Sequence, residues 1–338
     1  MKTKIAVTGA CGYIGSHTIV DLLQNGYDVI CLDSLVNSNE RVLLGVEKIT
    51  RQKISNTKID LADPLSWKFL AEEFQDISGV IHFAALKAVG ESVQQPLRYY
   101  DNNLNALLNV FKWMDAVRIP NLIFSSSCTV YGDQCSLPVK ETQAFGISPS
   151  PYGKTKQMGE WMMMDFLSAS HKQGISLRYF NPAGAHESAL IGEDPRNPAL
   201  NLVPVITETA IGKRESLTVF GNDYPTRDGS CIRDYVHIMD LARAHTLALE
   251  YLLYDKMSIS FDAYNLGIGQ GISVLEMIHA FEETTGQKLN YQIGPRRPGD
   301  IPEIWADASK AEKQLQWKPE HGVEEIMRSA WEWERRRN

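Results

Sequence analysis

The sequence predicts an α/β fold in which a doubly wound parallel sheet is followed by a smaller C-terminal α/β domain. In the first half of the chain, short β-rich runs alternate with amphipathic stretches, as in successive βαβ units. After Asn181 the sequence changes to loops rich in Pro, Gly and Asn with short helices between them. The 338 residues, 43% of them hydrophobic and 22% charged, suffice for one large core and a smaller second one.

The first half is expected to supply the strands of the sheet in chain order. One helix follows Gly12, and a long helix starts at Pro151, with Ser150 as its N-cap and proline at its first position. The expected strands are Lys4 to Thr8, Asp28 to Asp33, Lys53 to Asp60, Gly79 to Phe83, Asn121 to Ser125 and Ile175 to Phe180.

The domain boundary is expected near residue 180. Residues 1–180 would form the sheet domain, and residues 181–338 a second domain that covers the carboxyl edge of the sheet. The segment of about 236–266, which ends in the strand-like run Ala263 to Leu266, is expected to return to the first domain. The helices expected after Asn181 are Leu202 to Gly212, Ile238 to Leu253, Ser273 to Thr285 and Glu324 to Arg336.

The turn after the first strand carries glycine at positions 9, 12 and 15. Glycines there let the backbone turn tightly and approach a pyrophosphate at a helix N-terminus, which is the Rossmann-type arrangement for dinucleotides. Asp33 ends the second strand about 20 residues later, where a carboxylate accepts the adenosine ribose hydroxyls and repels a 2'-phosphate. The pattern therefore favours NAD over NADP. Asp60 and Leu61, at the next strand end, are suited to meet the adenine edge.

Tyr152 and Lys156 lie four residues apart, on one face of the helix that Pro151 opens. A phenol has a pKa near 10, so a tyrosine base at neutral pH needs that pKa lowered by about three, or roughly 4 kcal/mol. The Lys156 ammonium and a positively charged nicotinamide ring would both favour the phenolate. Ser127 follows the fifth strand at the sheet edge where ligands bind in this fold, so its hydroxyl can hydrogen-bond a reacting oxygen.

In this order, the glycine turn, Asp33, Ser127 and the Tyr152–Lys156 pair resemble the extended short-chain dehydrogenase/reductase superfamily. Further blocks are similar to the UDP-glucose 4-epimerase family over essentially the full length of the chain. These blocks are His82 to Ser92, Tyr99 to Asn103, Ser125 to Gly132, Arg178 to Pro182, Phe220 to Thr226 and Arg233 to His237.

The resemblance implies a set of ligand-binding positions. Besides Gly9, Gly12 and Gly15 of the turn, the positions that match NAD contacts are Tyr13, Ile14, Asp33, Ser34, Leu35, Val36, Asn37, Ser38, Asp60, Leu61, Phe83, Ala84, Ala85, Leu86, Lys87 and Asn102. Those that match the surroundings of the nicotinamide and the sugar are Ser127, Tyr152, Lys156 and Phe180. Those that match UDP-sugar contacts are Asn181, Asn201, Leu202, Phe220, Arg233, Tyr235, Arg297 and Asp300. Two arginines suit a diphosphate.

The resemblance also implies an isomerase that inverts C4 of UDP-galactose or UDP-glucose by transient oxidation with tightly bound NAD. Tyr152 would take the hydroxyl proton, Ser127 would orient the reacting oxygen, and Lys156 would hold the nicotinamide ribose and favour the phenolate. Ile304 falls where family members carry tyrosine or a smaller residue beside the sugar. It leaves a UDP-N-acetylhexosamine 4-epimerase, or an enzyme of dual specificity, as an open alternative.

Three other activities compete with this interpretation. A sugar-nucleotide 4,6-dehydratase resembles this chain but carries an Asp-Glu pair just before Val-Tyr-Gly, where Cys128 and Thr129 stand here. A net oxidoreductase would consume NAD stoichiometrically. A redox-sensing NAD-binding protein on the same scaffold can lack the catalytic tyrosine or lysine, and this chain has both Tyr152 and Lys156.

Composition argues against other classes of protein. A formal net charge of -7 disfavours nucleic-acid binding, and no run approaches the roughly 20 apolar residues of a membrane span. No metal-ligand spacing is found, and we expect a cytosolic protein whose thiols stay reduced. The cysteines are Cys11, Cys31, Cys128, Cys135 and Cys231. The resemblance implies a homodimer with contacts through Val89 to Val117 and Pro151 to Ala169.

Overall fold

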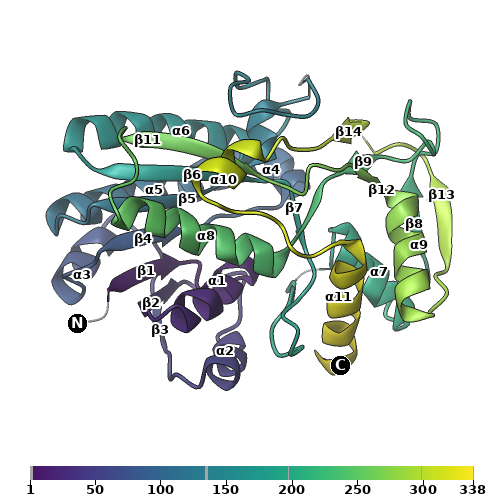
Figure 1. Cartoon of the computed structure of the whole chain (residues 1–338), viewed down its shortest axis with the longest axis horizontal. Helices are drawn as coiled ribbons and strands as arrows, with labels where there is room; N and C mark the ends of the chain where they lie inside the picture. Colours follow the sequence, from purple (N-terminus) through teal and green to yellow (C-terminus); the bar gives the residue numbers. More distant parts are fainter. Residues whose placement is uncertain (1–2, 134–135, 197, 298, 338) are drawn as a thin grey trace.

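One parallel sheet of seven strands lies between two layers of helices in the computed structural model (Figure 1). The structure describes residues 3–133, 136–196, 198–297 and 299–337, so Cys135 lies outside the described residues. The strand order is β3–β2–β1–β4–β5–β6–β11, and every neighbouring pair in it is parallel. The predicted doubly wound α/β sheet is therefore confirmed. None of the described helices is long and apolar enough to cross a membrane.

The strands of this sheet agree closely with the prediction in the centre and less well at the edge. They are β1 Lys4–Thr8, β2 Asp28–Asp33, β3 Asn56–Lys58, β4 Gly79–His82, β5 Asn121–Ser127, β6 Gln173–Tyr179 and β11 Phe261–Leu266. The expected strand Lys53 to Asp60 shrinks to β3, because an edge strand has one partner and only three of its residues pair with β2. In contrast, β5 pairs with β6 up to Ser127, two residues further than expected.

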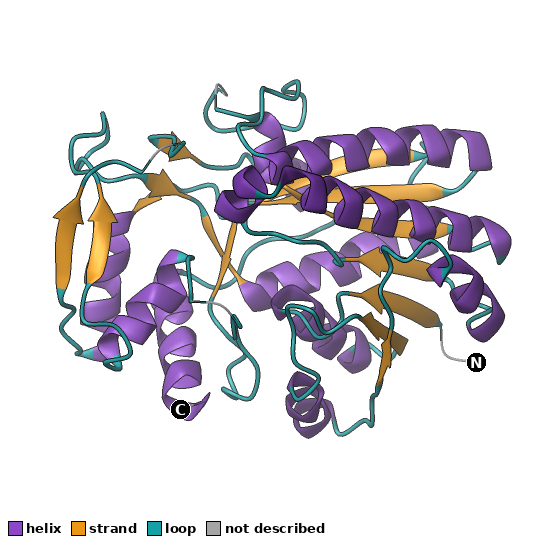
Figure 2. Ribbon diagram, turned by 180° about the vertical axis from the view of Figure 1, so that it is seen from behind, coloured by secondary structure: helices purple, strands orange, loops and turns teal. Residues whose placement is uncertain are grey.

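Helices cover both faces of the sheet, and each layer has its own apolar cluster. One layer contains α1 Tyr13–Gln24, α2 Val42–Thr50 and α8 Ile238–Leu253. The other contains α3 Ser66–Glu73, α5 Pro96–Ala116 and α6 Pro151–Ser170. Figure 2 shows the strands between these layers from behind. The short helix α4 Val89–Gln94 and the 3-10 turn η1 Cys128–Tyr131 lie on the connections.

The second part of the chain builds small sheets and three helices around a separate cluster. Its paired strands are β7 Asn181–Ala183 with β10 Tyr235–His237, β9 Ile232–Arg233 with β12 Ile272–Ser273 and β14 Glu303–Ile304, and β8 Leu217–Phe220 with β13 Tyr291–Gly294. Its helices are α7 Leu202–Ala210, α9 Val274–Thr285 and α11 Val323–Arg337, which lie side by side in Figure 1. Ser273 is the N-cap of α9 rather than its first residue, and it forms a capping box with Glu276.

The chain returns twice to the first layer after leaving it. Helix α8 packs against α1, and β11 adds the last strand of the sheet beside β6. The segment around α10 Ser309–Gln314 also packs there: Trp317 is fully buried in the first cluster, and its indole N–H donates to the Asp240 carbonyl at 2.8 Å. The domain boundaries predicted from the sequence, 1–180 with about 236–266, do not include the segment around α10 and Trp317.

The glycine turn after β1 is too tightly packed for side chains. Gly9 has a φ of +66°, and a Cβ there would lie 2.8 Å from the Ala84 nitrogen. A Cβ on Gly15 would overlap the Gly9 carbonyl oxygen. The turn therefore approaches the end of β4 as closely as the backbone permits.

We predict that Gly15→Ala lowers the free energy of unfolding by about 1–3 kcal/mol, the usual cost of overpacking. Gly90→Ala is the matched control. Gly90 is a helical residue of α4, and a Cβ added to it would have no neighbour within 4 Å, so alanine should leave stability unchanged or raise it by up to about 1 kcal/mol. Urea unfolding measures both variants, and equal midpoints for the two would contradict the account.

Candidate active site

Ser127 and Tyr152 meet where β5 ends and α6 begins. The Ser150 side chain caps α6 by accepting the Gly153 N–H at 3.2 Å, and Pro151 is its first residue, as predicted. This start places Tyr152 on the first turn of the helix, where the Ser127 hydroxyl is near enough to act on the pKa of its phenol. The Ser127 hydroxyl also accepts the Thr129 N–H at 3.3 Å and so caps η1.

Lys156 lies one turn further along α6 and points at the same strand. Its ammonium donates to the Ser125 carbonyl oxygen at 2.6 Å and lies 5.8 Å from the centre of the Tyr152 ring. The side chain is buried, and its Nζ is 4.9 Å from the centre of the Phe124 ring. The structure thus brings Ser127, Tyr152 and Lys156 together, although Ser127 is far from the other two in the sequence.

Burial dominates the electrostatics of this group. It raises the pKa of Tyr152 to about 12, although the hydrogen bond with Ser127 acts to lower it. It lowers the pKa of Lys156 to about 7, while the Glu160 carboxylate acts to raise it. In this structure Lys156 therefore does not lower the pKa of Tyr152 as expected. The lysine is itself desolvated, and its hydrogen bond goes to Ser125.

The predicted pyrophosphate turn presents an uncapped helix end. Gly12 is the N-cap of α1 and makes no side-chain cap hydrogen bond, and the first turn carries no acidic residue. The amide groups and dipole of this helix end are therefore available to an anion. Tyr13 and Ile14, the first helical residues, are partly buried, and the Tyr13 hydroxyl donates to the Gly184 carbonyl at 2.5 Å.

Asp33 fastens the glycine turn to the end of β2. Its Oδ2 accepts the Cys11 N–H at 2.9 Å. Its Oδ1 accepts the Leu35 N–H at 2.8 Å and the Ser38 hydroxyl at 2.7 Å. The Ser34–Ser38 loop, whose residues match NAD contacts in the family, therefore folds around this carboxylate. Val36 and Asn37 of the loop are exposed, as is Asp60, whose Oδ1 accepts the Ala62 N–H at 2.9 Å. Leu61 is buried under α5.

The segment Phe83–Lys87 leaves β4 beside the glycine turn. The Ala84 N–H donates to the Thr8 hydroxyl at 3.3 Å. Asn103 holds the Leu86 backbone on both sides, with its Oδ1 accepting the N–H at 2.8 Å and its Nδ2 donating to the carbonyl at 3.1 Å. The predicted Asn102 supports Asn103 through a 2.9 Å hydrogen bond. Asn103, which was not among the predicted ligand-binding positions, is thus the residue that fixes the backbone of the Phe83–Lys87 segment.

Glu193 links the two sets of predicted ligand-binding residues, and sequence reasoning missed it. Its Oε1 lies 3.2 Å from the Lys87 ammonium, a predicted NAD contact. The same oxygen accepts the Asn201 amide N–H at 2.8 Å, and Asn201 is a predicted UDP contact at the start of α7, before Leu202. Glu193 therefore joins the Phe83–Lys87 segment to the second part of the chain. No local signal marks it, because its partners are far away in sequence.

Two arginines from different elements converge on Asp300. Arg297 pairs with Asp300 at 2.8 Å, and Arg233 lies 3.8 Å from the same carboxylate oxygen. The Arg297 guanidinium also lies 5.5 Å from the centre of the Phe220 ring, which is 41% exposed. One carboxylate between two guanidinium groups leaves a net positive charge, which suits a diphosphate beside an aromatic face.

Asp234 organises the strands behind these arginines, and it too was missed. It is fully buried, and its carboxylate accepts the N–H groups of Ile268, Gly269 and Ala306 at 2.7–3.1 Å. Burial raises its pKa to about 6. The Asp234 carbonyl in turn accepts the N–H of the predicted Asn181 at 2.9 Å. The next residue, Tyr235, is buried in the apolar cluster of the second part.

Comparison with known proteins gives a consistent result. A family model described as GDP-mannose 4,6 dehydratase matches residues 6–330. The UDP-glucose 4-epimerase of Erwinia amylovora is 46% identical over 332 residues, 98% of this chain and 97% of that protein. The chain belongs to the UDP-glucose 4-epimerase family. The predicted relationship to the extended short-chain dehydrogenases/reductases is thereby confirmed.

Solved structures of this family superimpose on nearly the whole chain. The UDP-glucose 4-epimerase from Stenotrophomonas maltophila, with bound NAD and formylated UDP-arabinopyranose, is 43% identical with a TM-score of 0.94 and covers 99% of this chain and 98% of its own. The one from Bifidobacterium longum, in complex with NAD+ and UDP, is 43% identical with a TM-score of 0.92 over the same shares.

Two features bear on chemistry within the family. The positions after Ser127 are Cys128 and Thr129, so no carboxylate stands where a dehydratase has its Asp-Glu pair. Ile304 is 4% exposed on β14, opposite Arg233 in the strand register, and it packs in one cluster with the predicted Phe180. Within the described residues, no group of three or more His, Cys, Asp or Glu side chains is placed to hold a metal ion.

Proposed function

We propose that the protein interconverts UDP-galactose and UDP-glucose by NAD-dependent inversion at C4. The observation that carries this proposal is the convergence of three side chains at the end of β5: the Ser127 hydroxyl acts to lower the pKa of the Tyr152 phenol, and the Lys156 ammonium lies 5.8 Å from the centre of the Tyr152 ring. The next two positions, 128 and 129, lack the acid and base that elimination needs. Such a site can remove a proton and hold an oxygen, but it cannot dehydrate the sugar. Oxidation followed by reduction at the same carbon fits such a site, and the 46% identity to a UDP-glucose 4-epimerase favours it over a net oxidation.

The residues present fit NAD. The uncapped N-terminus of α1 suits the pyrophosphate, and the Asp33 carboxylate at the end of β2 suits the adenosine ribose and disfavours a 2'-phosphate. Lys87 and Asn102, on the segment and helix next to the turn, would also contact NAD, and Lys156 would hold its nicotinamide ribose. When bound, NAD supplies a hydride acceptor and donor for C4 and a positive ring charge close to the phenol.

Tyr152 is proposed as the base that takes the C4 hydroxyl proton and later returns it. Ser127 donates a hydrogen bond that favours the phenolate and orients the reacting oxygen. Lys156 would hold the nicotinamide ribose, as the resemblance implies, and the positive ring of bound NAD would supply the charge that favours the phenolate. The resulting 4-keto sugar must turn over within the pocket before reduction of its other face, so the site needs room around the sugar and a firm hold on the UDP.

That hold is proposed to come from the second part of the chain. Arg233 and Arg297 would exchange their shared partner Asp300 for the diphosphate, and Phe220 would lie against the uridine. Asn181, Asn201, Leu202 and Tyr235 border the same region as the resemblance implies. Because these residues would hold the UDP and not the sugar ring, the keto sugar could rotate while its nucleotide stays in place. The domains 1–180, with about 236–266, and 181–338 would thus bind the cofactor and the nucleotide respectively.

The direct test is to incubate the purified protein with UDP-galactose without added NAD and to follow the product by chromatography. We expect UDP-glucose to form until equilibrium, with no net change in NAD absorbance, because the cofactor is returned to its starting state. No conversion, even after NAD is added, would refute the proposed activity. Stoichiometric formation of reduced NAD would instead indicate a net oxidoreductase.

The range of UDP-sugars that the enzyme accepts is proposed to depend on Ile304, which falls at the position beside the sugar. Since isoleucine is smaller than tyrosine, UDP-GalNAc and UDP-GlcNAc are proposed as possible further substrates rather than as the main ones. A parallel incubation with UDP-GalNAc decides this point. Conversion at a rate similar to that of UDP-galactose would indicate dual specificity, and absence of conversion would restrict the enzyme to simple hexoses.

We predict that Tyr152→Phe folds and retains NAD but loses at least about a hundredfold of its turnover, the typical contribution of general acid–base catalysis. Phenylalanine fills the same space, so packing on β5 should survive. The cofactor content of the purified variant and its rate of UDP-glucose formation measure the two effects separately. Near-normal turnover would exclude Tyr152 as the base.

A homodimer through α5 and α6 is also proposed. These neighbouring helices expose Leu97 (81%), Leu108 (39%), Trp161 (49%) and Met164 (36%), more apolar surface than a solvated face needs. We predict a scattering mass twice the chain mass of 38.0 kDa, and a monomer for Trp161→Glu. The control Phe69→Glu, at a 43% exposed site on α3, should stay dimeric. A monomeric parent protein would contradict the proposal.

We further propose that the enzyme works in the cytosol. Cys11, Cys31 and Cys231 are buried, and among the described residues no disulfide is formed. Burial raises the pKa of the Cys11 thiol to about 12, so it stays protonated and unreactive. Thiols in this state are typical of proteins that live in a reducing compartment.

A further inference from the structure

Three residues of α6 contact three consecutive serines of β5. Tyr152, Lys156 and Glu160 are spaced by four, so they lie on one face of the helix. The Tyr152 phenol faces the Ser127 hydroxyl, which acts to lower its pKa, and Lys156 donates to the Ser125 carbonyl. Glu160 accepts the Ser126 hydroxyl at 2.5 Å. The first two contacts belong to the site described above, and the third has no part in it so far.

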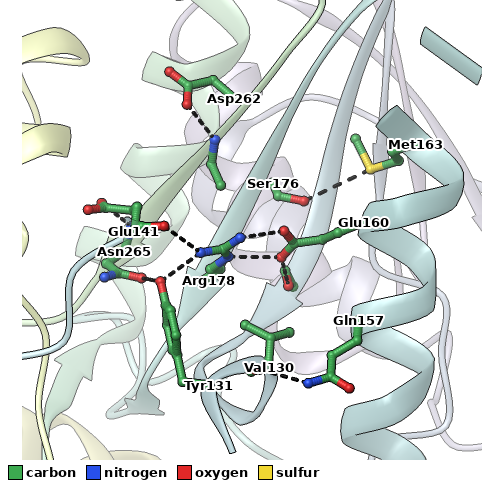
Figure 3. Close-up of polar contacts among 12 residues, drawn as sticks. Val130, Tyr131, Glu141, Gln157, Glu160, Met163, Ser176, Arg178, Asp262 and Asn265 are labelled. Atoms are coloured by element: carbon green, nitrogen blue, oxygen red, sulfur yellow. Dashed lines mark hydrogen bonds and ion pairs between the residues drawn. The ribbon is translucent and has the colours of Figure 1, made fainter. Parts of the chain in front are cut away.

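Glu160 is held by a fully buried arginine, as Figure 3 shows. Arg178 donates to Glu160 through Nε at 3.0 Å and through Nη2 at 2.7 Å, a two-point contact that fixes the plane of the carboxylate. Glu160 is 0% exposed and Arg178 5%. The remaining Nη1 donates to the Tyr131 hydroxyl at 2.8 Å, and this hydroxyl donates to Asn265 at 2.6 Å. The pair therefore ties α6, β6, η1 and β11 together.

Glu160 also acts on Lys156 through space. Burial lowers the pKa of Lys156 to about 7, and the carboxylate one turn away is the charged group that raises it. The other titratable groups that face this lysine are His82 on β4 and Tyr152 on α6. Cys128 on η1 and Tyr179 on β6 interact with Tyr152, and Arg178 on β6 is paired with Glu160. His82 is neutral because its pKa falls to about 3, and burial raises the pKa of both tyrosines.

We propose that Glu160, clamped by Arg178, is a positioning residue for the epimerisation: it sets the register of α6 on β5 and so places Tyr152 and Lys156 against the end of this strand. The proposal rests on the proposed function of Tyr152 and Lys156. A buried ion pair that served stability alone would not need to lie one helical turn from the reactive lysine. Such pairs are often replaceable by apolar residues at no cost in stability, which makes the two roles separable.

The test is the pH dependence of kcat/KM for UDP-galactose in the NAD-containing enzyme. Glu160→Gln keeps the shape of the side chain and removes its charge. Because the carboxylate raises the pKa of Lys156, its loss lowers that pKa, and activity should disappear at a lower pH on the alkaline side. We expect this alkaline limb to move down by at least about half a pH unit, with a lower kcat and bound NAD retained.

The matched control is Glu334→Gln, which removes another buried carboxylate. Glu334 lies on α11 and is paired with Arg337 of the same helix and with Lys213, which follows α7. It should lose stability without moving the pH profile. If Glu160→Gln does not fold, the charge-free double variant Glu160→Met with Arg178→Met replaces the pair by apolar side chains, and the same downward movement is expected.

An alkaline limb that coincides with the parent enzyme's, in a folded variant that has lost only thermal stability, would overturn the proposal, as would failure of both variants to fold. An inactive parent enzyme would instead refute the proposed function, so the two failures are distinguishable.

Discussion

The close packing of α6 on β5 is the constraint on which the rest of the site depends. Gly159 permits it, because a Cβ there would lie 2.7 Å from the Phe124 ring. Gly153 allows a similarly close approach between the start of the helix and the loop before it, where a Cβ would overlap the Ser148 hydroxyl. With the helix this close to the strand, Tyr152 and Lys156 meet Ser127 and Ser125 directly. A register shift of one residue would turn each of them away from its serine.

Close packing also excludes water, and this explains the electrostatic character of the site. A dry environment disfavours both the phenolate of Tyr152 and the ammonium of Lys156. The protein therefore needs charges that restore these forms, and it has one of them in Glu160. The other must arrive with the cofactor. An arrangement of this kind links catalysis to cofactor retention, since a site without its full set of charges keeps Tyr152 protonated and so unable to accept a proton.

Sequence reasoning located the local features of this fold well. The N-cap Ser150, the strand Asp28–Asp33 and the helix Ile238–Leu253 all follow from short-range patterns, and the structure confirms them. The features that it missed depend on partners far apart in the chain. Glu160 meets Arg178, Glu193 joins Lys87 to Asn201, and Asp234 binds backbone from residues 268–269 and 306. Burial, which decides the direction of the Tyr152 pKa, likewise has no local signal.

The central claim is that one hydrogen leaves C4 of the sugar and returns to the same carbon. UDP-galactose deuterated at C4 tests it most directly, in ordinary water and without added NAD, with the position of the label in the product read by NMR. The account predicts UDP-glucose that carries all of its deuterium at C4. Loss of the label to water, or its appearance at C6 as in a dehydratase, would contradict the account.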